Sequence, residues 1–180
     1  MAALAEAPLL LGLMAIAIMA HSFTLGGMAR WALSRDLMHF SAVHALAVAA
    51  LALTTLAETG RLPVDNPATH LELTMIHEAM VLEYSGPSLA LVEWAASLKL
   101  TLMLTVLIAV FLPWGMAAQS GGVGWAVALA VLLVKLAAFG TGIALLESSV
   151  AKMRMYEVPS FLGLASALAL LAVAFTALVK

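Results

Sequence analysis

The run VGWAVALAVLLVKLAAFGTGIALL, residues 123–146, carries one charged side chain, Lys135, in 24 consecutive positions. The hydrocarbon core of a bilayer is roughly 30 Å thick, and about 20 apolar residues in a helix cross it. This stretch therefore predicts a transmembrane helix, and the other apolar runs of the chain are then candidates for further membrane spans.

Four further runs have the same character, and together they account for most of the chain. Of the 180 residues, 64% are hydrophobic and only 10% are charged, which is more apolar surface than a water-soluble domain of this size can bury. We predict an all-α, polytopic membrane bundle that forms a single transmembrane domain over residues 1–180. The five expected spans lie near residues 5–25, 39–57, 88–112, 123–146 and 159–179.

Charge and cysteine content exclude several classes of function. The net charge is -2 and the basic residues are scattered, so a nucleic-acid interface is not expected. The chain has no cysteine, so it forms no disulfide and cannot ligate an iron–sulfur cluster or a nickel–iron centre through thiolates. Any such redox metal would belong to another chain.

The N-terminus and the basic residues bear on topology. The first apolar run lacks a basic leading region and has Glu6 in its place, which favours a retained helix over a signal peptide. Five spans place residues 58–87 and the 147–159 connection on one face. The positive-inside rule gives three basic residues on each side, so it does not orient the chain.

The segment between the second and third spans, residues 58–87, differs from the rest of the chain. It holds half of the ten acidic residues, and against them it has a single Arg61 and two histidines. Asn66 before Pro67 resembles a helix N-cap, and residues 85–87 read Ser-Gly-Pro, a helix stop. We expect an amphipathic helix between these signals, lying at the membrane surface against other protein. The acidic and histidine side chains of the segment are Glu58, Asp65, His70, Glu72, His77, Glu78 and Glu83.

Ionisable groups inside a span are the next candidates, because each costs roughly 2.5–3.5 kcal/mol to insert. In an antiparallel hairpin, Lys99 and Lys135 would share one depth near the bilayer midplane and could be neighbours. Two close ammonium groups favour the loss of one proton, which a proton relay needs. Glu93, two turns from Lys99, could be the next carrier. The alternative is that each lysine caps a carbonyl or pairs with an acid between helices.

Other polar and aromatic side chains have simpler interpretations. His21 and His44 are expected to donate hydrogen bonds between helices, which is the commoner role of a lone histidine in a membrane. The four tryptophans lie near span ends, where amphipathic rings are favoured. The histidine and carboxylate spacing of residues 70–78 fits neither HExxH nor the Glu-x-x-His pairs of di-iron bundles, so no metal site is predicted.

The stretch ETGRLPVD, residues 58–65, resembles the E-T-N-R-x-P-F-D loop in the family of complex I membrane subunits that border the quinone site. The following residues 66–91, NPATHLELTMIHEAMVLEYSGPSLAL, are similar to the hydrogenase branch of that family, which includes hydrogenase 4 component C and its formate hydrogenlyase counterpart. Two positions depart from the quinone-reducing branch, Gly60 in place of Asn and Val64 in place of Phe. The acidic run after Asp65 is also thinned, which argues against a quinone chamber here.

The resemblance implies a non-catalytic membrane-anchor and proton-coupling subunit of a group 4 nickel–iron hydrogenase in a bacterial or archaeal inner membrane. Its implied partners are the hydrogenase large and small subunits, which carry the nickel–iron centre and iron–sulfur clusters, and antiporter-like membrane subunits. No cofactor is expected in this chain. The resemblance places residues 58–87 in the cytoplasm and matches the chain to the last five spans of longer relatives.

The site that we expect combines the ionisable residues in and between the spans with the residues that the family resemblance implies. The coupling or proton-path set is Glu58, Asp65, Glu72, Glu78, Glu83, Glu93, Lys99 and Lys135, and the partner-docking set is Arg61, His70 and His77. Two alternatives stay open: the quinone-site membrane subunit of an NADH-quinone oxidoreductase, and a free-standing ion transporter that uses Lys99, Lys135 and Glu93. The electron donor and the transported ion, H⁺ or Na⁺, are not indicated by any residue.

Overall fold

The computed structural model describes residues 2–34, 41–61, 64, 83–115, 121–150 and 157–178, and every regular element among them is an α-helix. The elements are α1 (Ala2–Ala20), α2 (Leu25–Leu33), α3 (Ala42–Glu58), α5 (Pro87–Phe111), α6 (Gly122–Ser149) and α7 (Val158–Leu178). The all-α prediction is confirmed.

The expected amphipathic helix after Asn66 falls almost wholly outside the described residues. Five of the predicted site residues fall there as well: Asp65, His70, Glu72, His77 and Glu78. The roles expected of this helix and of these five side chains therefore stay predictions.

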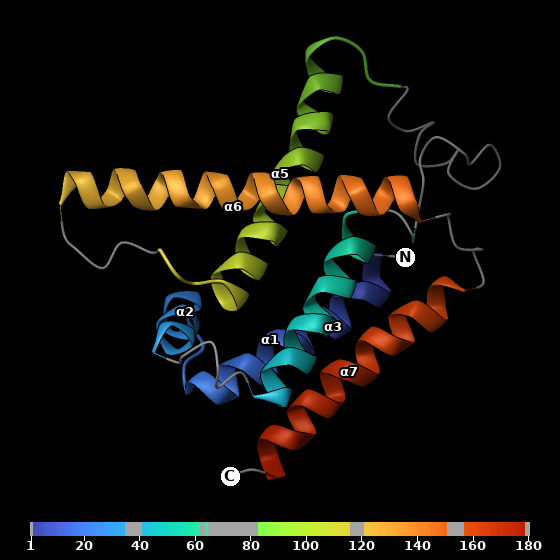
Figure 1. Cartoon of the computed structure of the whole chain (residues 1–180). Helices are drawn as coiled ribbons and strands as arrows, with labels where there is room; N and C mark the ends of the chain where they lie inside the picture. The colour runs from blue at the N-terminus through green and yellow to red at the C-terminus, as the bar shows by residue number, and fades with distance from the viewer. Residues whose placement is uncertain are drawn as a thin grey trace.

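The core of the molecule is a three-helix bundle of α1, α3 and α7, which lie side by side in Figure 1. Small residues line its interface, and Ala47, Ala169 and Ala172 are completely buried. Alanine and glycine allow helix backbones to approach closely, which is how helices associate where lipid removes the hydrophobic driving force. A Cβ added to Gly12 would lie 3.6 Å from the carbonyl oxygen of Ala47, so α1 and α3 are close at this point.

The chain bends inside the first predicted span, residues 5–25, whose bounds stay a prediction. Helix α1 stops at Ala20, and α2 follows after a bend of 58° where a loop was expected. The N–H groups of His21 and Ser22 donate to the carbonyls of Ile18 and Ala17, and His21 has a φ of 49°, which together are the pattern of a Schellman helix stop. A short cap then begins the next helix, where the N–H of Gly27 donates to the Thr24 hydroxyl.

Among the described residues, three helices, α5, α6 and α7, are long and apolar enough to cross a membrane, and α1 with α2 would make a fourth crossing if the bent pair is one span. Helix α3 has 17 residues and is shorter. The chain is thus a multi-pass helical membrane protein, while the total of five spans stays a prediction.

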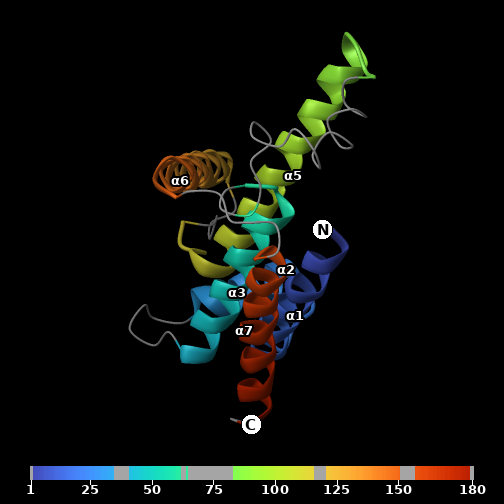
Figure 2. The same cartoon turned by 90° about the vertical axis from the view of Figure 1, so that its right-hand side faces the viewer.

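Helices α5 and α6 extend outside the three-helix bundle. Figure 2 shows α6 nearly end-on in a view that shows α5 and α7 along their length, so α6 runs across its neighbours. Among the described helices α6 packs only against α5, and no residue within Gly122–Ser149 is buried. The antiparallel hairpin expected for α5 and α6 is therefore wrong.

Candidate functional site

The 58–65 segment begins at the end of α3, where a second Schellman stop sets its geometry. The N–H groups of Gly60 and Arg61 donate to the carbonyls of Ala57 and Leu56, and Gly60 has a φ of 60°. This left-handed conformation suits glycine and, after it, asparagine. Gly60 therefore adopts the backbone conformation of this turn without the steric cost that a Cβ would bring.

A few residues further on, Val64 anchors the segment. It is 8% exposed and packs with Ala5 of α1 and with Val158 and Leu162 of α7. Its N–H donates to the carbonyl of Arg61. The backbone of Arg61 is therefore held on one side by the helix stop and on the other by a buried valine.

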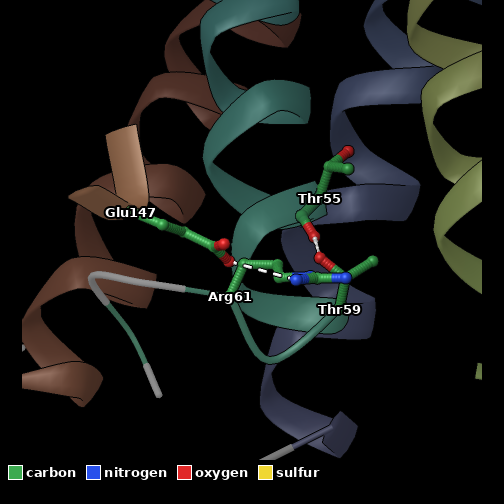
Figure 3. Close-up of polar contacts among 4 residues, drawn as sticks. All are labelled: Thr55, Thr59, Arg61 and Glu147. Atoms are coloured by element: carbon green, nitrogen blue, oxygen red, sulfur yellow. Dashed lines mark hydrogen bonds and ion pairs between the residues drawn. The ribbon is translucent and has the colours of Figure 1, made fainter. Parts of the chain in front are cut away.

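Two ion pairs connect this turn to the outer helices. The Lys99 ammonium of α5 donates to Glu58 Oε2 at 2.6 Å, and the Arg61 guanidinium donates to Glu147 Oε1 of α6 at 3.3 Å (Figure 3). Both carboxylates lie in the last turn of a helix, where the negative end of the helix dipole disfavours an anion. The cationic partners offset this cost.

The two pairs differ in the burial of their carboxylates. The Glu58 side chain is 6% exposed, and its Oε1 is buried without a hydrogen-bond partner among the described residues. The two cations are similarly exposed, Lys99 at 44% and Arg61 at 42%, and Glu147 is 27% exposed. The Arg61 pair is therefore close to a surface pair, worth about 0.2–1 kcal/mol in water. Removing Lys99 would leave a buried carboxylate, so the Glu58 pair has the greater structural consequence.

Lys135 has a different role from Lys99. Its ammonium donates to the carbonyl oxygen of Leu112 at 2.6 Å and also to that of Trp114, both just beyond the end of α5. Lys99 and Leu112 are 13 positions apart in the sequence, or roughly 20 Å along a helix, so the structure does not bring the two lysines together. The neighbouring-lysine expectation is wrong, and the contacts match the alternative of a carbonyl cap for one lysine and an acid partner for the other.

The remaining predicted residues lie apart from this turn or at other breaks in the chain. Glu83 and Glu93 are exposed, and Glu93 lies on α5 before Lys99. His44 is buried, with its ring centroid 5.6 Å from that of Trp31, and His21 is exposed at the break after α1.

Sequence reasoning missed Glu147, which was not among the predicted site residues. The available signal was its place at the start of the 147–159 connection, which was expected on the same face as Arg61. That position predicted that Glu147 and Arg61 lie on the same face of the membrane, but it did not predict that the two side chains are in contact.

The fold and these charges define a class of protein: a helical membrane protein in which the turn after α3 is tied by ion pairs to two outer helices. The sequence profile of the NADH dehydrogenase family matches residues 1–178, so the chain belongs to that family.

Two curated proteins of Escherichia coli (strain K12) are similar to the chain. Formate hydrogenlyase subunit 4 is 33% identical over 160 residues, which cover 87% of this chain and 50% of that protein. Hydrogenase-4 component C is 31% identical over 118 residues, which cover 66% of this chain and 36% of that protein. The chain thus spans about half the length of the first relative and less of the second. No solved structure matches it.

Proposed function

We propose that this chain is a membrane-anchor and proton-coupling subunit of a group 4 nickel–iron hydrogenase of the formate hydrogenlyase or hydrogenase 4 type. The observation that carries the proposal is the 58–65 segment, whose turn is joined by Lys99 and Glu147 to two outer helices. The similarity to two hydrogenase-complex proteins supports it. The chain would catalyse nothing alone.

In this proposal the hydrogenase large and small subunits dock on the cytoplasmic side, at residues 58–87. They would hold the nickel–iron centre and the iron–sulfur clusters, and antiporter-like subunits would adjoin the chain in the membrane. Docking would involve Arg61, His70 and His77. The coupling or proton path would use Glu58, Asp65, Glu72, Glu78, Glu83, Glu93, Lys99 and Lys135.

Affinity purification tests the assignment. The chain is tagged in its own host, membranes are dissolved in mild detergent, and co-purifying proteins are identified by mass spectrometry. The eluate is also assayed for hydrogen-dependent reduction of methyl viologen. We expect hydrogenase large and small subunits together with this activity, and recovery of the chain without them would contradict the proposal.

The match to the NADH dehydrogenase family favours a second candidate, the quinone-site membrane subunit of a complex I relative. The same preparation separates the two functions. Quinone-reductase partners, and electron transfer to added quinone that is lost in Glu58→Gln, would favour the second candidate.

A further inference from the structure

Helix α6 has few attachments to the rest of the molecule. It packs only against α5 among the described helices, and none of the residues from Gly122 to Ser149 is buried. Near its C-terminal end, Glu147 reaches Arg61, a residue 86 positions earlier in the chain. Within the described part of the chain, this ion pair is the polar link between α6 and the turn after α3.

The turn that carries Arg61 is well suited to receive such a link. Gly60 ends α3 in a left-handed conformation, and Val64 is buried against α1 and α7. Beside Arg61, the Thr59 hydroxyl donates to the carbonyl of Thr55 at 2.7 Å (Figure 3). The backbone on both sides of Arg61 is therefore held by the three-helix bundle, so a group that holds the guanidinium also fixes α6 relative to the 58–65 segment.

We infer that Glu147 is a positioning residue whose carboxylate holds Arg61 and thereby sets α6 against the 58–65 segment for partner docking. The docking part of this inference rests on the proposed function. Glu147 itself need not touch a partner, since it acts through Arg61. The neighbouring pair, Glu58 with Lys99, holds α5 to the same turn, so the two outer helices are positioned by separate charges.

Charge reversal tests the pair in the tagged full-length chain in its own membrane. Glu147→Arg and Arg61→Glu are each expected to lower recovery of hydrogenase subunits about fivefold, because each places like charges opposite one another. Each single reversal should also lower the melting temperature of the purified chain in detergent. The combined reversal, Arg61→Glu with Glu147→Arg, restores the attraction within the chain and should return the melting temperature to near the unmodified value, while recovery stays low because Arg61 itself docks the partner. Glu6→Arg, which makes the same charge change at an exposed acid of α1, is the matched control and should leave recovery unchanged.

Cross-linking gives a readout that needs no partner. Arg61→Lys keeps the ion pair with Glu147, and a carbodiimide joins a lysine to a carboxylate that it contacts. We expect an amide between positions 61 and 147 within one chain in membranes, identified by mass spectrometry of the digested chain. The control, Arg61→Lys with Glu147→Gln, has no carboxylate at position 147 and should give no such amide. This measurement remains informative if a reversal variant fails to assemble.

The outcomes distinguish the positioning role of Glu147 from the proposed function as a hydrogenase subunit. Absence of the cross-link, failure of the combined reversal to restore the melting temperature, or unchanged recovery in Glu147→Arg would overturn the inference. An unmodified chain that recovers no hydrogenase, while the Arg61→Lys variant forms the cross-link, would overturn the proposed function and leave the pairing of position 61 with Glu147 supported.

Discussion

Gly60 and Glu58 show how single residues shape the turn after α3. Gly60 takes a φ of 60°, and an added Cβ would meet no other atom within 4 Å, so only backbone conformation restricts this position. Glu58 has little solvent exposure and pairs with the charge of Lys99. Substitutions at Gly60 test the cost of the left-handed backbone conformation, and substitutions at the Glu58 pair test the cost of an unpaired buried charge.

Replacing Gly60 by alanine should destabilise the helix stop by about 1–2 kcal/mol, the cost of the left-handed conformation for a residue with a Cβ. Gly60→Asn should cost less, since asparagine adopts this conformation more readily. Thermal unfolding of the purified chain in detergent measures both. Equal melting temperatures for Gly60→Ala and Gly60→Asn would contradict the conformational explanation.

Lys99→Met should lower stability by about 1–3 kcal/mol, because it leaves the buried Glu58 carboxylate without its partner. The double variant Lys99→Met with Glu58→Gln removes the uncompensated charge and should recover much of the loss. The same thermal measurement compares the two. A double variant that is no more stable than Lys99→Met would show that the charge was not the cause.

At the scale of elements, the junction of α5 and α6 depends on Lys135. The 112–115 turn lies against the middle of α6, and a Cβ on Gly115 would come 2.7 Å from the Val131 side chain. The Lys135 ammonium donates to two carbonyl oxygens of this turn. These contacts hold α6 against the end of α5.

Lys135→Met should destabilise the junction by about 1–3 kcal/mol, since it leaves carbonyl oxygens without a donor in apolar surroundings. Lys135→Arg keeps the donors and is the control for charge. Thermal unfolding in detergent measures how much the hydrogen bonds from Lys135 to the two carbonyl oxygens stabilise the junction. Proton-coupled turnover in membranes tests the separate hypothesis that Lys99 and Lys135 relay protons. Unchanged turnover in both Lys99→Ala and Lys135→Ala would reject the relay hypothesis.

At the scale of the molecule, the buried core lies among α1, α2, α3, α7 and the C-terminal half of α5. Helices α1, α3 and α7 pack together, while α6 exposes apolar side chains along its length, including Trp125 at 68%. In a membrane protein such a surface contacts lipid or the apolar helices of other subunits.

A variant of the isolated chain that retains only Trp125 should therefore be quenched strongly by brominated phospholipids in vesicles. The matched variant that retains only Trp31, which is partly buried beside His44, should be quenched less. Tryptophan fluorescence measures the difference. Equal quenching would indicate that α6 is covered in the isolated chain.

The apolar runs were sufficient to predict an all-helical membrane protein, because the cost of exposing backbone in hydrocarbon leaves few alternatives. The family resemblance likewise followed from local residues 58–91. Local sequence did not reveal the break at His21, the crossing of α6 over α5, or the partners of the two lysines. Nor did it identify Glu147 as the partner of Arg61, since contacts between residues distant in sequence depend on how the helices pack, and only the tertiary structure brings those side chains together.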